Sequence, residues 1–255
     1  MLGGIVRPRV VALPPPFWGL EFDGTDDYAV AARASASDFD FGTASFTMIW
    51  WINPSADDAR RWFFASKDAG NGVIYAEKRA DDTFHLRCTD ALGVSVSASG
   101  TSTMGVAGTQ WVWVGAVVDR TAGKVYVFFN GAVDNGAGAD IGAVGTMTFA
   151  AGDVRLGYLV GGGYYAGTIA QLRVWKGTAL TAAQMLAEYN NIDPYGWPGP
   201  TPTLLHAFQP GTNPQTPPPF LGATTFQLGS ASGVDTNDPT WVAVPYRRLG
   251  PGGPS

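Results

Sequence analysis

The stretch from Tyr165 to Asn190, reading YAGTIAQLRVWKGTALTAAQMLAEYN, constrains the fold more than any other part of this sequence. Between Thr168 and Trp175 apolar and polar residues alternate, with one irregularity near Ala170, and this pattern predicts a half-buried strand. The alternation assigns two sets of side chains, with Ile169, Leu172 and Val174 facing a core and Gln171, Arg173 and Lys176 facing solvent.

A short helix is predicted directly after this strand. Thr181 can accept a hydrogen bond from the first turn while Gln184 reaches back to it, which is a capping box. Leu180 and Met185 stand at the two positions of a hydrophobic staple. The stretch therefore predicts a strand, a tight turn and a one-sided helix that packs on the edge of a sheet.

Three further stretches share an order and spacing with a known family. They are LEFDGTDDY at 20–28, SFTMIWWINP at 45–54 and WVWVGAVVDRTAGKVYVFFNG at 111–131. With 165–190 they resemble laminin-G-like domains of the concanavalin A-like lectin and glucanase superfamily. The resemblance implies an all-β fold, a two-sheet antiparallel jelly-roll sandwich with one short helix after the closing strand, to which proline-rich arms are added.

The sequence also predicts how the chain is divided. It suggests an extended arm at 1–17, the jelly roll at 18–192, a proline-rich linker at 193–219, further strands at 220–245 and a tail at 246–255. The strands at 220–245 resemble a segment that comes before the opening strand in many family members. They therefore complete either the sandwich of their own chain or that of a neighbouring subunit.

Composition excludes several classes of function. The net charge is −5 and Lys and Arg do not cluster, so we expect no nucleic-acid partner. Apolar runs are far shorter than the roughly 20 residues that a bilayer requires, so we expect no membrane span.

The run 111–118 is apolar on both faces and predicts a central strand that is covered on each side. The single cysteine, Cys88, is expected to be a small buried residue.

The candidate catalytic residues of the sequence do not match the patterns that enzymes of this kind require. A β-glucanase of this superfamily would carry E-x-D-x-x-E on one strand, and the segment Glu21-Phe22-Asp23-Gly24-Thr25-Asp26 departs from it in its last acid and in its central glycine. We interpret it as a turn that Asp23 and Asp26 brace. His85 and His206 have no triad-like neighbours and are expected to be structural. The sequence therefore predicts no catalytic residues.

Ligand-binding candidates are aromatic or acidic. Sugar faces stack on exposed rings, and Trp62, Tyr164 and Tyr165 are the candidates for that role. Asp23 and Asp26 are candidate calcium ligands, but no contiguous calcium loop is present, so no firm metal site and no cofactor is predicted.

The sequence favours a non-enzymatic structural or surface-binding protein, and the first interpretation is a bacteriophage virion component such as a capsid decoration, head fibre or tail-associated protein. Its partners would be other virion proteins or copies of itself, with cell-surface glycans as a further class. Because prolines interrupt the apolar N-terminal stretch, we expect synthesis in a host cytoplasm and a place on the virion surface. The alternative is an extracellular carbohydrate-binding module or lectin.

Overall fold

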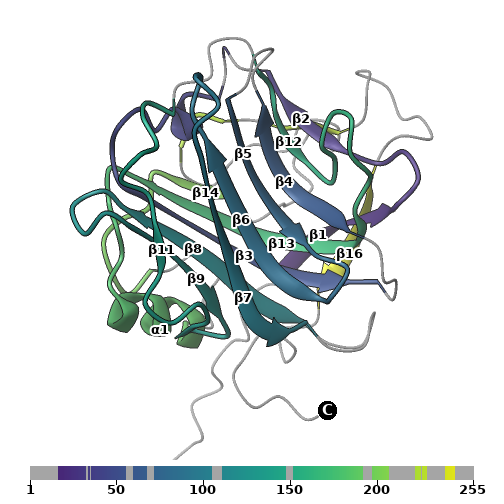
Figure 1. Ribbon diagram of the computed structural model, residues 1–255. Coiled ribbons are helices and arrows are strands. Elements are labelled where there is room, and N and C mark those ends of the chain that lie inside the picture. Colours follow the sequence, from purple (N-terminus) through teal and green to yellow (C-terminus); the bar gives the residue numbers. More distant parts are fainter. Residues whose placement is uncertain are drawn as a thin grey trace, which may run out of the picture.

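The computed structural model describes residues 17–32, 34, 36–55, 60–67, 72–104, 111–147, 152–191, 197–206, 222–224, 226–228 and 239–244. These residues form two antiparallel β-sheets, one of nine strands and one of seven, which pack face to face (Figure 1). We name them sheet A and sheet B. The predicted all-β, two-sheet antiparallel sandwich is thereby confirmed.

Sheet A lies behind sheet B in Figure 1 and has a continuous path of seven strands with two more beside it. In spatial order the path is β10 (Ala132–Val133), β9 (Lys124–Phe129), β8 (Val112–Asp119), β3 (Phe46–Pro54), β13 (Ala166–Lys176), β1 (Phe17–Asp23) and β16 (Thr240–Val244). The strands off this path are β11 (Ala139–Asp140), which pairs with β9, and β14 (Leu204–His206), which pairs with β13.

Sheet B lies in front and carries the steeply inclined strands of Figure 1. Its spatial order is β15 (Gln227–Leu228), β2 (Ala29–Ala31), β12 (Val154–Leu156), β4 (Arg61–Lys67), β5 (Val73–Lys78), β6 (Thr83–Thr89) and β7 (Ser95–Thr103). Two helical elements complete the described residues, the 3-10 turn η2 (Ser37–Phe39) and the helix α1 (Ala182–Asn190).

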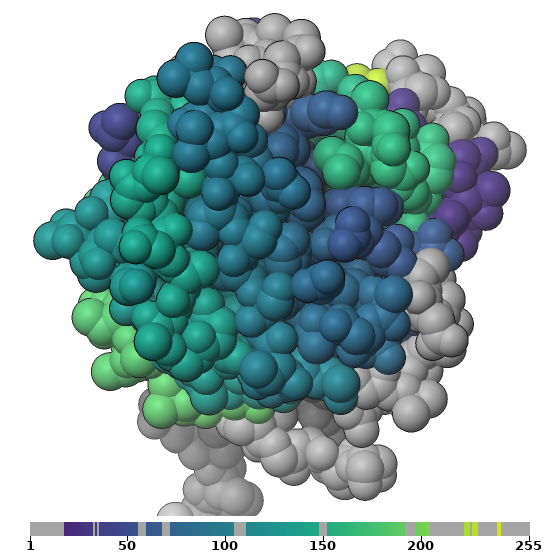
Figure 2. All heavy atoms as spheres, in the orientation of Figure 1, coloured from purple at the N-terminus to yellow at the C-terminus, as the bar shows by residue number. Residues whose placement is uncertain are grey.

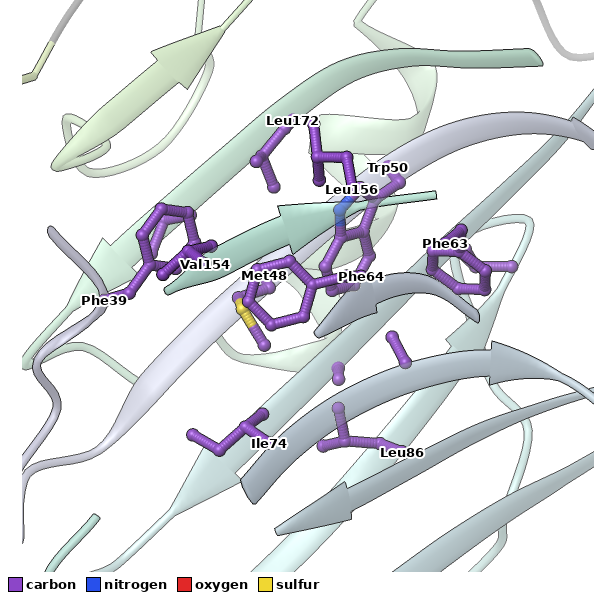
Figure 3. Packing of buried hydrophobic residues seen from close by; sticks show 14 of the residues in the cluster. Phe39, Met48, Trp50, Phe63, Phe64, Ile74, Leu86, Val154, Leu156 and Leu172 are labelled. Carbon is purple, nitrogen blue, oxygen red and sulfur yellow. The ribbon is translucent and has the colours of Figure 1, made fainter. Parts of the chain in front are cut away.

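The main core fills the space between the two sheets. Trp50 of β3 is fully buried and meets the ring of Phe63 edge-on, with ring centroids 5.4 Å apart (Figure 3). Phe64 and Phe84 from sheet B approach the same indole. Aromatic rings from both sheets therefore interlock at the centre of the sandwich, and each contributes by the large apolar area it removes from water.

The strand predicted at 168–175 is part of β13, and its irregularity near Ala170 is a β-bulge. The pairing with β3 shifts register between Ala170 and Arg173, and Gln171 takes a positive φ of 49°. Ile169 and Val174 face the main core, as predicted. Gln171 and Arg173, however, are buried and do not meet solvent. For these two residues the prediction of solvent exposure is wrong because a second layer covers this side of sheet A, whereas Lys176 is exposed as predicted.

That second layer is α1. Its predicted capping box is present: the Thr181 hydroxyl accepts from the Gln184 N–H, and the Gln184 side-chain oxygen accepts from the Thr181 N–H at 2.8 Å. Met185 is buried against a small apolar cluster on the outer face of sheet A. The members of this outer cluster are Ile49, Trp51, Trp113, Val117, Phe128, Ala170, Trp175, Leu180 and Met185. Strand β8 is thus covered on each side, as its apolar sequence predicts.

The C-terminal strands lie in the sheets of their own chain. Strand β16 pairs antiparallel with β1, and β15 pairs antiparallel with β2. Much of the predicted arm, linker and tail, at 1–16, 192–196, 207–221 and 245–255, lies outside the described residues. No described helix has the length and apolar character needed to cross a membrane.

Candidate ligand-binding face

The outer face of sheet B, turned away from the main core, is polar. Side chains alternate along β4 to β7, and one set, exemplified by Phe64, Ala76 and Leu86, enters the core. The other set forms the surface at the centre of the view in Figure 2, where residues of β4 to β7 are blue. We call this surface the outer face of sheet B.

Strand pairing arranges the outer-face side chains in three rows that cross β4, β5, β6 and β7. In that strand order the rows are Trp62, Glu77, His85 and Ser99, then Ala65, Tyr75, Arg87 and Ser97, then Lys67, Val73, Thr89 and Ser95. Directly opposed side chains in neighbouring strands lie within contact distance. The face is therefore a continuous lattice of hydroxyls, charges and a few rings.

The first row holds a buried carboxylate with two nitrogen partners, one in the row and one, Arg60, just before β4. Glu77 is fully buried, and its carboxylate lies 2.8 Å from Nδ1 of His85 and 3.3 Å from Nε of Arg60. A buried carboxylate needs such partners because removal from water strongly disfavours the isolated charge. The cluster places His85 in a structural role and keeps the Glu77 oxygens engaged within the protein.

A cavity of about 300 Å³ opens beside the second and third rows. It is lined by Lys67 of β4, Val73 and Tyr75 of β5, Arg87 and Thr89 of β6, and two loop residues, Gly93 and Leu159. The lining thus combines two cations, two hydroxyls and an apolar wall. Such a mixture of apolar surface and a few directional polar groups is typical of small-molecule sites.

Hydrogen bonds hold the polar groups of the cavity in place. The Arg87 guanidinium donates to the hydroxyls of Thr89 at 3.3 Å and Ser95 at 3.1 Å. The Lys67 ammonium donates to the Val160 carbonyl at 3.2 Å and so fixes the loop that carries Leu159. Burial and the nearby Glu77 carboxylate raise the pKa of Tyr75 above its ordinary value of 10.0, so its phenol stays protonated at neutral pH.

The aromatic residues predicted to bind ligand are not brought together at this cavity. Trp62 lies on the outer face beneath the three glycines at 161–163, where a Cβ on Gly162 would approach its ring to 3.1 Å. Tyr164 stacks on Tyr158 at the rim, with centroids 4.4 Å apart. Both rings are partly buried, and other residues line the cavity.

The sequence prediction for Tyr165, which treated its ring as exposed, is wrong. Its side chain is 0% exposed and packs edge-on against Phe22 and Phe63 in the main core. After the turn at 160–162 the chain runs extended beside 157–158, so Tyr164 is partly buried at the surface while Tyr165 enters the core. A ring in this position cannot stack on a sugar without opening the core.

The predicted calcium candidates do come together. Carboxylate oxygens of Asp23, Asp26 and Asp27 all lie within 4.8 Å of one another. Asp23 Oδ1 accepts the N–H of Thr25 at 2.7 Å, and Asp27 Oδ2 accepts the N–H of Asp23 at 2.7 Å. Asp23 thus braces the turn after β1, as the sequence interpretation expects, but the second bracing carboxylate is that of Asp27, while Asp26 takes part through its backbone N–H. Calcium binding there stays a prediction.

Sequence reasoning missed Lys67, Tyr75 and Arg87 as a group. Each sits in a strand whose alternation is clear, but their meeting depends on how β4, β5 and β6 pair. The available signal was the polar side of β6, where His85, Arg87 and Thr89 alternate with core residues. A solvent-facing row of that kind reads equally well as an ordinary exposed strand face.

Comparison with known proteins gives one family and several similar structures. A family model described as the concanavalin A-like lectin/glucanases superfamily matches residues 23–185. A search of curated protein sequences finds no match.

Three solved structures illustrate the shared fold. A putative carbohydrate-binding protein from Bacteroides ovatus has a TM-score of 0.62 at 17% identity, over 90% of this chain and 60% of that one. The CBM40 of Ruminococcus gnavus IT-sialidase, bound to α2,3-sialyllactose, has a TM-score of 0.52 at 15% identity, over 66% and 94%. A heptameric SAP-like pentraxin from Limulus polyphemus has a TM-score of 0.50 at 18% identity, over 69% and 83%. At these identities the likeness concerns the fold.

Proposed function

Because this chain belongs to the concanavalin A-like lectin/glucanases superfamily, we propose that it is a non-enzymatic carbohydrate-binding protein. The observation that carries the proposal is the cavity of about 300 Å³ on the outer face of sheet B. This volume is at the lower end of the range of small-ligand sites and suits a short saccharide.

The chemistry of the lining supports a saccharide as ligand. A sugar ring presents apolar C–H faces and a rim of hydroxyls, so it needs both apolar contact and directional hydrogen bonds. Val73 and Leu159 supply the apolar wall, and Tyr75, Thr89 and Arg87 supply donors and acceptors. The hydrogen bonds within the protein fix these groups before a ligand arrives, which lowers the entropic cost of binding.

The structural neighbours add weight to this proposal. Two of the proteins with the same fold are a putative carbohydrate-binding protein and a sialidase carbohydrate-binding module. Function inferred from a shared fold is an analogy, so the cavity itself remains the main support.

The same face supports a binding role in preference to catalysis. Hydrolysis of a glycosidic bond needs two carboxyl groups flanking the substrate. On the outer face of sheet B, Glu77 is buried and engaged with His85 and Arg60, and the cavity lining, as far as its residues are described, includes no acid. The proposed protein therefore has no catalytic residues, in line with the sequence prediction.

The test is binding on a glycan array followed by titration calorimetry of the best ligand. We expect Tyr75→Ala to abolish measurable binding, and Tyr75→Phe to weaken it roughly 2- to 12-fold through loss of one hydrogen bond. Tyr126→Phe is the matched control because it makes the same change on β9 of sheet A. Absence of any glycan ligand, or equal binding by wild type and Tyr75→Ala, would contradict the proposal.

The virion role is a separate proposal that depends on the proline-rich segments, most of which lie outside the described residues. Its partners and its place on a virion surface, or alternatively an extracellular location, stay predictions. Light scattering of the full chain beside a chain lacking 1–17 and 246–255 tests it. A defined oligomer that becomes a folded monomer on trimming would support assembly through these segments, and two monomers would argue against it.

A further inference from the structure

We propose that the saccharide bound on the outer face of sheet B carries an anionic substituent, either a carboxylate or a sulfate ester. This inference rests on the proposed carbohydrate-binding function and specifies its ligand class. It is drawn from the charges that line the cavity of about 300 Å³.

The cavity is positive although the chain as a whole is negative. Lys67 and Arg87 line it, and none of the described residues of the lining is acidic. The chain has a net charge of −5, so a local pair of cations runs against the overall composition. The acid in the adjacent row, Glu77, is already paired with His85 and Arg60.

Both cations bind neutral oxygens in the described part of the chain. Arg87 donates to the hydroxyls of Thr89 and Ser95, and Lys67 donates to the Val160 carbonyl. Among the described residues neither one forms an ion pair, in contrast to Arg155 of the same face, which meets Asp153 at 3.3 Å. Their charges are therefore available to a ligand that supplies the missing anion.

The arrangement also suits an anion attached to a ring. Lys67 on β4 and Arg87 on β6 stand on either side of β5, whose Tyr75 and Val73 form the floor between them. Neighbouring strands are about 4.8 Å apart, so β4 and β6 lie about 10 Å apart on either side of β5. The Lys67 ammonium is bonded to the Val160 carbonyl in the loop after β12 and the Arg87 guanidinium to the Ser95 hydroxyl on β7, so an anion over β5 would draw each cation inward from a neutral partner. An anionic group held between them would leave the ring against the floor, and charge-assisted hydrogen bonds are the stronger kind.

The experiment compares matched ligands by titration calorimetry on the full chain. The pairs are α2,3-sialyllactose against lactose, and galactose 6-sulfate against galactose. We expect at least one acidic ligand to bind roughly tenfold or more tightly than its neutral partner, with an affinity that falls as salt rises. The pair that shows the preference identifies the carboxylate or the sulfate as the recognised group.

Variants locate the effect within the cavity. Arg87→Gln and Lys67→Gln should each weaken binding of the acidic ligand roughly tenfold or more, while Lys67→Arg should retain most of it. Arg155→Gln removes the same charge from the same face but outside the cavity lining, and should change affinity less than about twofold. Circular dichroism of each variant confirms that it is folded.

Two results would overturn the inference, and they can be told apart. Equal binding of neutral and acidic ligands, still lost in Tyr75→Ala, would reject the anionic ligand and leave the carbohydrate-binding function standing. An acidic preference that Arg87→Gln, Lys67→Gln and Arg155→Gln all reduce equally would show general charge attraction and would also reject it. Failure to bind any saccharide would reject the function together with the inference.

Discussion

The outer faces of the two sheets are built from the same alternating strands but have opposite chemistry. On sheet A the outward residues are large and apolar, including Trp51, Trp113 and Trp175, and α1 covers them. On sheet B the outward residues are polar or charged, and a cavity opens among them. Both faces of sheet A are therefore buried by packing, whereas one face of sheet B is in contact with the surroundings.

The difference teaches where stability and binding reside. Burial of apolar surface supplies most of the stability of a domain, and the outer cluster adds a second buried layer to sheet A. A polar face with a buried ion cluster adds little, because desolvation offsets the attraction of its charges. Substitutions on the covered face should hence lower stability, and those in the cavity should lower ligand affinity.

The largest expected effect comes from the ion pair beneath α1. Arg173 Nη1 lies 2.5 Å from the Glu188 carboxylate, and both side chains are buried. Glu188→Ala leaves the guanidinium buried without its carboxylate, and we expect the free energy of unfolding to fall by roughly 3–5 kcal/mol. Urea denaturation measures the loss, and Arg173→Met with Glu188→Leu should restore much of it.

A loss below about 1 kcal/mol in Glu188→Ala would mean that water reaches this pair and that α1 does not seal sheet A. The comparison between the two faces would then fail. Glycan affinity of the folded Glu188→Ala protein should match that of wild type.

Apolar packing on the covered face gives the next effect. Met185 is 0% exposed in the outer cluster, whereas its neighbour Leu186 is 47% exposed on the other side of the helix. Met185→Ala should lower the free energy of unfolding by about 3 kcal/mol through lost burial and a cavity. Leu186→Ala is the control and should change it by less than about 0.5 kcal/mol.

Similar losses in Met185→Ala and Leu186→Ala would show that α1 lies on sheet A without close packing. Thermal and urea unfolding of both proteins decide this, because the two substitutions sit on one helix and differ mainly in burial.

Local sequence signals predict the strand and helix on the outer face of sheet A, but they do not predict which of its charged residues are buried. The capping residues of α1 and the doubly apolar β8 are readable because both depend on short-range patterns. Arg173 was expected in solvent because a charge in an alternating strand usually faces water. It is buried because Glu188, which is 15 residues away, supplies its partner.

The cavity on the outer face of sheet B was harder to predict for a related reason. Alternation shows that β4, β5 and β6 each have a polar side, but register decides that Lys67, Tyr75 and Arg87 line one cavity. Aromatic residues near glycines were the available signal for ligand binding, and Tyr165 shows its weakness, since a glycine turn can also direct a ring into the core.

Low pH should reduce the stability of the protein through Asp90, in the turn after β6. Asp90 follows β6, and although burial opposes it, hydrogen bonds from the N–H groups of Gly145, Val94 and Leu92 hold the pKa of this carboxyl below its ordinary value of 3.8. Below pH about 4 the unfolded chain therefore binds the proton more readily than the folded one, and stability falls as pH falls through the folded pKa.

Asp90→Asn tests this link between pH and stability. The variant should have a free energy of unfolding about 1 kcal/mol lower than wild type at pH 7. Between pH 5 and pH 3, the range in which carboxyl groups titrate, its stability should fall less steeply than that of wild type. Urea midpoints across that range measure both. Parallel curves for the two proteins would mean that Asp90 does not hold the β6–β7 turn to the loop at Gly145.

The smallest effect is expected from calcium at the turn after β1, and it would break the comparison if it proved large. The oxygens of Asp23 and Asp27 already accept backbone N–H groups of their own turn, so we expect chelation to shift Tm by less than about 1 °C. Calcium bound at 100 times its Kd would instead add about 2.7 kcal/mol, which corresponds to roughly 5–10 °C in a chain of this size. A shift of that size, absent in Asp23→Asn, would place a second ligand site at the end of β1, in the sheet to which the comparison assigns packing alone.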